Sequence, residues 1–249
     1  MSLLVVENLS VERDGRGLVK DASFSVSEGE LVILLGPNGA GKTSLLKACL
    51  GLDRTKKGSV SLGASALTDL SPTQRARLVS YLPQTQDLAW PNRVSDLVSL
   101  GRFAHGAAMG RLGEAVEQAL TACDVKHLSE RSADTLSGGE IARVHFARAF
   151  AAEAPLLIAD EPVAALDPRH QFRIMDLIKS FVANGGGALV VLHDVSLAAK
   201  YADRLIWMLD GKIVADGSVT ETLTAHRMAE IYGVAAEING AQVQITGTL

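Results

Sequence analysis

Hydrophobic residues follow two different patterns along the chain. Residues 3–26 alternate between apolar and polar side chains and are interrupted by the turn sequence RDGRG at 13–17, which predicts paired antiparallel strands. Continuous apolar runs occur instead at 30–35, 156–160 and 188–193. Such runs predict strands that are buried on both faces, as in a parallel sheet that is covered by helices.

Helical periodicity and turn residues predict the remaining elements. From residue 90 to 152 the helical pattern is nearly continuous, and we interpret this stretch as an insertion into the sheet-forming part of the chain. Asp-Gly and Asn-Gly turns within 204–217 and 234–246 predict two β-hairpins. The pattern as a whole predicts an α/β fold with a mostly parallel core sheet, an antiparallel β subdomain and an inserted helical subdomain. Individual helices are expected at 41–51, 71–78, 94–103, 112–124, 140–153 and 168–183, and further strands at 58–63 and 79–83.

Composition limits the classes of function. A chain of 249 residues with 47% hydrophobic residues can bury a core, and a formal net charge of -4 gives no overall basic field that would attract nucleic acid. Cys49 and Cys123 lie in apolar helical patterns without metal-binding spacing, so we expect buried, reduced thiols. No apolar run approaches the roughly 18 residues of a spanning helix, and the N-terminus lacks a basic signal-peptide region. If the protein acts at a membrane, another chain supplies the pore.

The sequence GPNGAGKT at residues 36–43 matches the pattern GxxxxGK[ST] at every fixed position. It lies between a predicted buried strand and a predicted helix, which is the context that a phosphate-binding loop requires. Glycines let backbone N–H groups converge on a phosphate, a lysine can reach its oxygens, and a threonine hydroxyl can bind Mg²⁺. The alternative, a glycine-rich turn with an exposed lysine, is disfavoured by this context. We expect ATP contacts from Gly36, Pro37, Asn38, Gly39, Ala40, Gly41, Lys42, Thr43 and Ser44, with Lys42 also catalytic.

Acidic residues and a histidine follow two other buried strands. Asp160 and Glu161 end the run at 156–160, and His193 ends the run at 188–193, so all three are expected at the carboxyl edge of the sheet. Because successive strand residues point to opposite sides, we expect Asp160 to bind Mg²⁺ through water and Glu161 to act as the general base. His193 is expected to contact the γ-phosphate, although a lone histidine more often has a structural role. We interpret His105, His127, His145, His170 and His226 as surface or packing residues.

The sequence LSGGE at residues 136–140 precedes another predicted helix. Ser137, Gly138 and Gly139 place a hydroxyl and free backbone N–H groups at that helix N-terminus, which is suited to binding a phosphate. The simpler interpretation is a helix cap. Two adjacent glycines are looser than a cap needs, however, and favour a close approach of the backbone to another molecule. The residues alone leave open whether this loop and the loop at 36–43 bind one nucleotide.

Six motifs in this order make the whole chain resemble an ABC transporter ATPase. They are GPNGAGKT, Gln84, LSGGE, LLIADEP, AALD at 164–167 and His193. The resemblance implies a homodimer in which Ser137 and Gly139 of one chain cap the ATP that is bound by the other chain, while Asp167 links the two sites. It also implies that Gln84 senses Mg²⁺ and the attacking water, and that it joins the helical insertion to a membrane partner.

A closer similarity is to the importer ATPases for iron-siderophore complexes, haem and cobalamin. It rests on YLPQ, VSDLVSLGRFAHG, the glutamate of LSGGE and TAHRMAEIYGV. It implies integral membrane permease subunits, a periplasmic substrate-binding protein that acts through them, and a peripheral location on the cytoplasmic face of the inner membrane. The surface around Gln84, Trp90 and Arg102 is expected to seat the permease. Arg13 stands where most relatives stack an aromatic ring on adenine, and Val163 replaces a common threonine or serine.

The resemblance also organises the chain and ranks its alternatives. We expect one ATPase domain over 1–249, with a catalytic core at 1–88 and 153–233, a helical subdomain at 89–152 and a C-terminal β-hairpin at 234–249. A soluble ABC-type ATPase that acts on ribosomes or DNA is the alternative. The chain has neither a second cassette nor a coiled-coil insertion, and it is slightly acidic, so no nucleic-acid partner is expected. An exporter ATPase is disfavoured because no membrane domain is fused to the chain.

Overall fold

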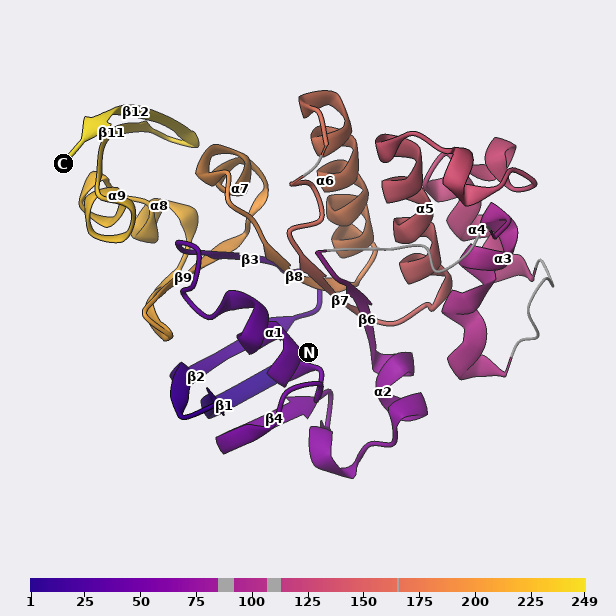
Figure 1. Ribbon diagram of the computed structural model, residues 1–249, viewed down its shortest axis with the longest axis horizontal. Coiled ribbons are helices and arrows are strands. Elements are labelled where there is room, and N and C mark those ends of the chain that lie inside the picture. Colours follow the sequence, from indigo (N-terminus) through magenta and orange to yellow (C-terminus); the bar gives the residue numbers. More distant parts are fainter. Residues whose placement is uncertain (85–91, 107–112, 165) are drawn as a thin grey trace.

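The computed structural model describes residues 1–84, 92–106, 113–164 and 166–249 (Figure 1). A central parallel sheet joins three parts of the molecule: an antiparallel sheet below it in the view, a helical part at one side, and a C-terminal hairpin at the other. Trp90, Ala165 and the expected 88/89 boundary lie outside the described residues. The division of the chain into a core, a helical subdomain and a hairpin therefore stays a prediction, although the described elements agree with the expected fold class.

The central sheet has six strands in the order β10-β9-β3-β8-β7-β6. Neighbouring strands are parallel except at β10, which folds back on β9 across the predicted Asp-Gly turn. Every residue of β3, β7 and β8 is buried, as the continuous apolar runs predict. The strands are β3 (Leu31–Leu35), β6 (Val79–Leu82), β7 (Leu156–Asp160), β8 (Gly187–Val191), β9 (Arg204–Leu209) and β10 (Lys212–Gly217).

The two faces of this sheet are covered by different layers. Along β3, Leu31, Ile33 and Leu35 point into one core, whereas Val32 and Leu34 point into the other. The second core also contains the antiparallel sheet, in the order β2-β1-β4-β5, and helix α1. Its elements are β1 (Ser2–Arg13), β2 (Arg16–Ser27), β4 (Thr55–Leu62), β5 (Ser65–Ala66), α1 (Lys42–Cys49) and α2 (Pro72–Leu78).

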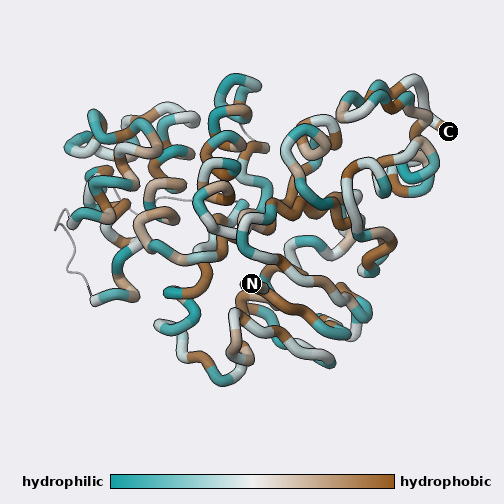
Figure 2. The backbone as a smooth tube through the Cα atoms, turned by 180° about the vertical axis from the view of Figure 1, so that it is seen from behind, coloured by the Kyte–Doolittle hydropathy of each residue, from teal (hydrophilic) through white to brown (hydrophobic). Residues whose placement is uncertain are grey.

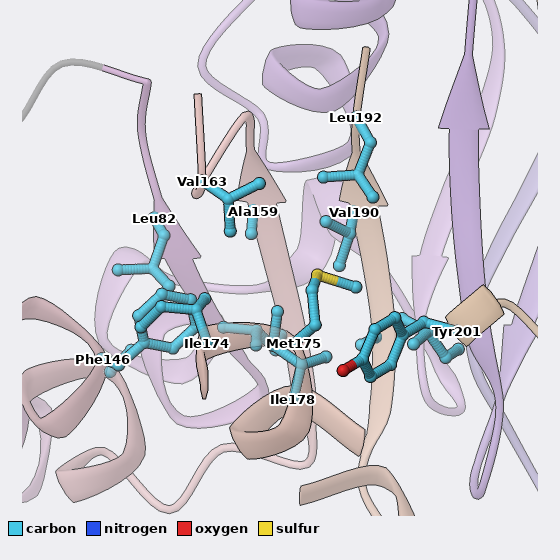
Figure 3. Close-up of a cluster of buried hydrophobic side chains, with 14 of the residues drawn as sticks. Leu82, Phe146, Ala159, Val163, Ile174, Met175, Ile178, Val190, Leu192 and Tyr201 are labelled. Atoms are coloured by element: carbon cyan, nitrogen blue, oxygen red, sulfur yellow. The ribbon is translucent and has the colours of Figure 1, made fainter. Parts of the chain in front are cut away.

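The first core lies between the sheet and helix α6 (Pro168–Ala183). Figure 3 shows Ile174, Met175 and Ile178 of this helix pointing toward Ala159 of β7 and Val190 of β8. Brown segments of the tube in Figure 2 mark the same central strands as the most hydrophobic part of the chain. Helix α7 (Val195–Tyr201) completes this layer, so the sheet is buried on both faces and its carboxyl edge is free to carry polar residues.

The helical part consists of α3 (Val94–Ser99), α4 (Glu114–Ala122) and α5 (Gly138–Ala151). Where the sequence predicted one helix over 94–103, the structure has α3 followed by a 3-10 turn, Leu100–His105. A side chain at Gly101 would lie 2.1 Å from the carbonyl oxygen of Arg148, so this turn packs directly on the backbone of α5. The predicted helix at 140–153 begins earlier, because Ser137 caps it.

The C-terminal part contains two short helices and a hairpin. They are α8 (Val219–Thr222), α9 (Ala225–Tyr232), β11 (Val234–Asn239) and β12 (Gln242–Thr248). The hairpin closes at the predicted Asn-Gly turn and lies beside α7, where the Ser196 hydroxyl donates to the carbonyl oxygen of Val243 at 3.5 Å. Among the helices in the described part of the chain, none combines the length and the apolar character that crossing a membrane needs.

Candidate nucleotide-binding and hydrolysis site

The loop at 36–43 joins the buried strand β3 to helix α1 and is shaped by glycine. Gly36 and Gly41 have φ angles of 150° and 98°, which are conformations that favour glycine. A Cβ atom at Gly36 would lie 2.2 Å from the carbonyl oxygen of Met208, and one at Gly41 would lie 2.2 Å from that of Leu18. These glycines therefore let the loop pass close to the backbones of β9 and β2, and such a glycine-rich loop is suited to turning its N–H groups toward a phosphate.

Lys42 is held in place by the loop that precedes it. Its side-chain Nζ donates to the carbonyl oxygens of Gly36 at 2.6 Å and Pro37 at 3.0 Å, and the residue is buried. Burial lowers the pKa of the Lys42 ammonium, while the nearby carboxylates of Glu161 and Asp160 oppose that effect. The structure therefore excludes the exposed lysine of the simpler interpretation and instead shows an ammonium that is fixed at the centre of the loop.

Asp160, the last residue of β7, is only 1% exposed. Neither of its carboxylate oxygens has a hydrogen-bond partner within the described residues. Burial raises the pKa of this carboxyl, and the nearby Thr43 side chain partly offsets the effect. A buried carboxylate without a partner is costly unless a cation neutralises it, so the residues present fit a Mg²⁺ ion. Thr43 and Asp160 would supply the protein oxygens, since the described residues contain no cluster of three acidic, His or Cys side chains that could hold a metal alone.

Glu161 is placed apart from Asp160 by an unusual backbone turn. Its φ of 53° is left-handed, and its N–H donates to the carbonyl oxygen of Val191 at 3.2 Å. The side chain then meets two others: Gln84 Nε2 donates to Glu161 Oε2 at 2.7 Å, and His193 Nε2 pairs with Glu161 Oε1. Two residues predicted to act separately, Gln84 and His193, are thus brought together on one carboxylate.

A cavity of about 420 Å³ unites these groups with the phosphate loop. Leu18 is the one lining residue that the sequence reasoning missed. It follows the RDGRG turn, and only the tertiary contact of its carbonyl with Gly41 marks it, so the sequence carries no local signal for it. The cavity is lined by Leu18, Asn38, Gly39, Ala40, Gly41, Lys42, Thr43, Ser44, Gln84, Glu161 and His193.

Arg13 has a different set of contacts from the predicted adenine stacking. Its Nη2 donates to both carboxylate oxygens of Asp53 at 2.8 Å, and it does not line the cavity. The ion pair gives this guanidinium a bidentate partner at the edge of the antiparallel sheet. An adenine contact through Arg13 stays a prediction, and it would have to compete with this pair.

The loop at 136–140, which we call the signature loop, caps its own helix. The Ser137 hydroxyl accepts from the N–H of Glu140 at 3.4 Å, and the Glu140 carboxylate accepts from the N–H of Ser137 at 2.8 Å. The N–H of Ser137 and the Ser137 hydroxyl, which also donates to the Glu140 carboxylate at 2.8 Å, lower the pKa of Glu140. Ser137, Gly138 and Gly139 are all absent from the lining of the cavity, so one chain does not bring its signature loop to its own phosphate loop.

Asp167 caps helix α6 and is paired within the same turn. One carboxylate oxygen accepts from the N–H of His170 at 3.0 Å, and the other lies 2.8 Å from Nδ1 of the same residue. These contacts lower the pKa of Asp167, the backbone hydrogen bond having the largest effect. The ring of His170 in turn covers Gly139, where a Cβ would lie 2.4 Å from ring atom Cδ2. The sequence assigned His170 only to the surface or to packing, and this contact with the signature loop was missed.

Arg102 was predicted to help seat the permease, and His145 was predicted to be a surface or packing residue. Arg102 Nη1 donates to the carbonyl oxygen of Ala151 at 3.1 Å and to the Glu153 carboxylate at 2.5 Å, so its side chain is fixed against the end of α5. His145 is buried without a partner for either ring nitrogen among the described residues, which agrees with its interpretation as a packing residue. Burial, with a smaller effect from Arg148, lowers its pKa to about 4, so the ring is neutral near pH 7.

A phosphate loop at the carboxyl edge of a parallel sheet, sharing one cavity with a Glu161 carboxylate that Gln84 and His193 orient, defines an ATP-binding cassette that hydrolyses its nucleotide. The sequence profile of the ABC transporter family matches residues 19–164. The chain therefore belongs to the ABC transporter family.

Known relatives are similar over nearly the whole chain. The hemin import ATP-binding protein HmuV of Agrobacterium fabrum is 37% identical over 93% of this chain and 92% of its own length. Its counterpart in Pseudomonas fluorescens is 40% identical over 93% of both chains. A solved ATP-binding subunit of an ABC transporter superposes with a TM-score of 0.79 at 28% identity, covering 94% of this chain and 95% of its own. A dimeric bacterial ABC transporter cassette gives 0.76 at 25% identity, covering 87% and 98%.

Proposed function

We propose that this protein is the ATP-hydrolysing subunit of an importer for an iron-containing chelate, with haem as the cargo that the relatives favour. A ferric siderophore complex or cobalamin is the alternative cargo. The observation that carries the proposal is the shared cavity of Lys42, Glu161, Gln84 and His193, together with relatives that are named for hemin import along almost the full chain. Neither the described residues nor the names of these relatives favour the alternative task on ribosomes or DNA.

In this proposal the phosphate loop holds ATP through its backbone N–H groups and Lys42. The Lys42 ammonium, which now bonds to the carbonyls of Gly36 and Pro37, would exchange those acceptors for β- and γ-phosphate oxygens. Thr43 and Asp160, together with Gln84, would hold a Mg²⁺ ion, whose positive charge would neutralise part of the negative charge of the phosphates. The raised pKa of Asp160 fits a carboxyl that gains its partner only when the nucleotide arrives.

Glu161 serves as the general base. It accepts a proton from a water molecule whose oxygen forms a bond to the γ-phosphorus, while the bond from that phosphorus to the bridging β-γ oxygen breaks and ADP leaves. Gln84 contacts one oxygen of Glu161 and His193 contacts the other, so in this proposal they orient the base before the reaction. His193 is 40% exposed toward the cavity, which leaves its ring available to a γ-phosphate oxygen.

The signature loop completes the site from a second copy of the chain. Ser137, Gly138 and Gly139 lie away from their own phosphate loop, and a homodimer would let each chain supply both halves of two sites. The related cassette that forms a dimer supports this arrangement. Asp167, at the start of α6, would reach the partner's site across the same interface.

A permease would bind the helical side of the protein. Gln84, Arg102 and Trp90, the last of which lies outside the described residues, are the proposed contacts. Phe103, next to Arg102, is 79% exposed and gives this surface an apolar element. The subunit would then sit on the cytoplasmic face of the inner membrane, and a periplasmic substrate-binding protein would deliver the cargo to the permease from the other side.

The dimer is tested with Glu161→Gln. The amide keeps the shape of the side chain but cannot accept the proton, so we expect Mg-ATP to accumulate a dimer in sedimentation and turnover to fall by about 100-fold or more. Glu237→Gln, on the exposed hairpin, is the control and should behave as wild type. A variant that binds nucleotide but stays monomeric at saturating Mg-ATP would contradict the shared sites.

The cargo is tested by purifying the subunit with its partners from native membranes in mild detergent. A polytopic permease that retains a haem, recognised by its Soret absorbance, supports haem import. A permease with a bound corrin or ferric siderophore would change the cargo and keep the importer. Ribosomal or DNA-repair proteins in place of a permease would overturn the proposal.

A further inference from the structure

Two segments that act on different nucleotides in the proposed dimer contact the same residue within one chain. The signature loop belongs to the site of the partner, whereas residues 161–167 lead from the base Glu161 of the chain's own site to Asp167. Their point of contact is His170, in the first turn of α6. The inference below rests on the proposed function, because it requires the dimer.

The contact with the signature loop is close and explains Gly139. This glycine is buried, whereas Ser137 and Gly138 just before it are exposed, and its backbone is ordinary helix without a positive φ. A Cβ there would lie 2.4 Å from Cδ2 and 2.5 Å from Nε2 of His170. At Gly138, in contrast, no atom lies within 4 Å of such a Cβ. A side chain at 139 would displace the imidazole ring of His170, so glycine at this position lets the ring pack against the start of α5.

The contact with the other segment is polar. His170 holds Asp167 twice, through its backbone N–H at 3.0 Å and its Nδ1 at 2.8 Å. The next residue, Gln171, donates from Nε2 to the carbonyl oxygen of Val163 at 3.3 Å. Ala164 donates in turn to the carbonyl of Glu161 at 3.3 Å. Hydrogen bonds therefore join the start of α6 to Asp167 and Val163, and join Ala164 to Glu161.

We propose that His170 is a positioning residue that couples the signature loop to Asp167 and, through residues 161–167, to Glu161. Movement of Asp167 on dimer formation would carry the His170 ring with it. The ring would then displace Gly139, because close-packed atoms transmit small displacements to their neighbours. The state of one nucleotide site would then bias the loop that binds the other nucleotide, which is a coupling between two distinct sites.

The test uses the Glu161→Gln background, where ATP-dependent dimers accumulate. We expect His170→Ala to raise the ATP concentration for half-maximal dimer formation about fivefold, because a contact and a hydrogen bond to a carboxylate are both lost. The affinity of the monomer for a fluorescent nucleotide should stay at the parent value, and the thermal midpoint should fall by no more than about 4 °C, as for the loss of an exposed pair. His226→Ala, an exposed histidine in α9, is the matched control. An unchanged ATP requirement in His170→Ala would overturn the coupling, whereas failure of the parent to dimerise would overturn the proposed function instead.

Two further comparisons separate positioning from a general loss of structure. His170→Asn keeps a donor for Asp167 but lacks the ring that covers Gly139, so the ATP requirement should stay raised. A return to the parent requirement would show that packing on Gly139 has no part in the coupling. In a double-mutant cycle with Asp167→Ala, the double variant should be no worse than Asp167→Ala alone, because the two residues act along one route. Additive losses would show that His170 acts independently of Asp167 and would refute the proposed route.

Discussion

Asp160→Asn provides a sharp test of the proposed Mg²⁺ site, because it should stabilise the empty protein while removing the part of the response to Mg-ATP that depends on Mg²⁺. Asp160 is 1% exposed and has no hydrogen-bond partner for either oxygen among the described residues. An ionised group in that position weakens the fold until a cation binds it. The amide has nearly the same shape and carries no charge, so it removes the cost and also the ligand.

The burial of Asp160 sets the size of the expected change in stability. A buried polar group without a partner costs about 1–3 kcal/mol and a charged one costs more. The amide avoids only the extra cost of the charge, and Thr43 and Lys42 already offset part of that cost, so we expect a gain of about 1–2 kcal/mol in the free energy of unfolding. For a chain of this length that corresponds to a rise of about 2–8 °C in Tm. The pKa of Asp160 is raised in the folded state, so the folded state binds more protons than the unfolded state just above the ordinary pKa of 3.8. Wild-type stability should therefore fall as pH rises through the folded pKa, and this part of the fall should vanish in Asp160→Asn.

The assay is thermal unfolding of wild type and Asp160→Asn between acidic and neutral pH, without nucleotide and with Mg-ATP or ATP alone. Asp14→Asn, at an exposed turn, controls for loss of a charge. We expect Mg²⁺ to add to the stabilisation by ATP in wild type, as linkage requires for a ligand of the folded state, and to add nothing in the variant. A lower Tm for Asp160→Asn than for wild type at pH 7 without nucleotide would refute the reasoning, since it would show that the carboxylate already has a partner.

Three other substitutions test separate features. His145→Leu should make the protein less sensitive to acid. Folding lowers the pKa of His145 from 6.5 to about 4, so the wild-type free energy of unfolding should fall by up to about 3 kcal/mol as pH falls through that interval. Urea unfolding at pH 7 and pH 4.5 would measure this loss, which the leucine variant should not show. Gly41→Ala should weaken nucleotide binding far more than Gly39→Ala, because only the former meets a backbone oxygen, at 2.2 Å; equal losses in calorimetric titration would disprove this. Arg13→Ala should cost less than about 1 kcal/mol of stability, as an exposed pair does, and an altered ATP-to-GTP preference would indicate that Arg13 contacts the base.

The sequence predicts the fold well where burial alone decides the pattern. The apolar runs at β3, β7 and β8 can be only buried strands, and the helix predicted at 168–183 has those bounds because Asp167 and Pro168 give it a clear start. The prediction fails where tertiary contact decides. Residues 100–105 carry a helical pattern, but Gly101 packs on the backbone of α5 and the segment becomes a 3-10 turn. No local pattern contains that contact.

In the candidate site, too, some features follow from local sequence patterns and others depend on tertiary contacts. Lys42, Asp160, Glu161 and His193 can be found from motifs at strand ends, since parallel strands end at one edge. The pairing of Gln84 with Glu161 and the covering of Gly139 by His170 could not be found in this way. Both depend on how far apart two segments lie after folding, which spacing along the chain does not reveal.

Strand register explains why the catalytic cluster forms at all. Leu82 of β6 pairs with Ala159 of β7, and Ala159 pairs in turn with Val190 of β8. Gln84 and Glu161 each lie two residues beyond their paired positions, and His193 lies three beyond its own, so all three emerge at one level of the sheet edge. The left-handed turn at Glu161 then directs that carboxylate into the cavity, while Asp160 stays in the sheet. A register slip of one residue would exchange the faces of β7 and put Leu156 and Ile158 into the core that now holds Leu157 and Ala159. The packing of the two cores therefore fixes the position of the base as well as the fold.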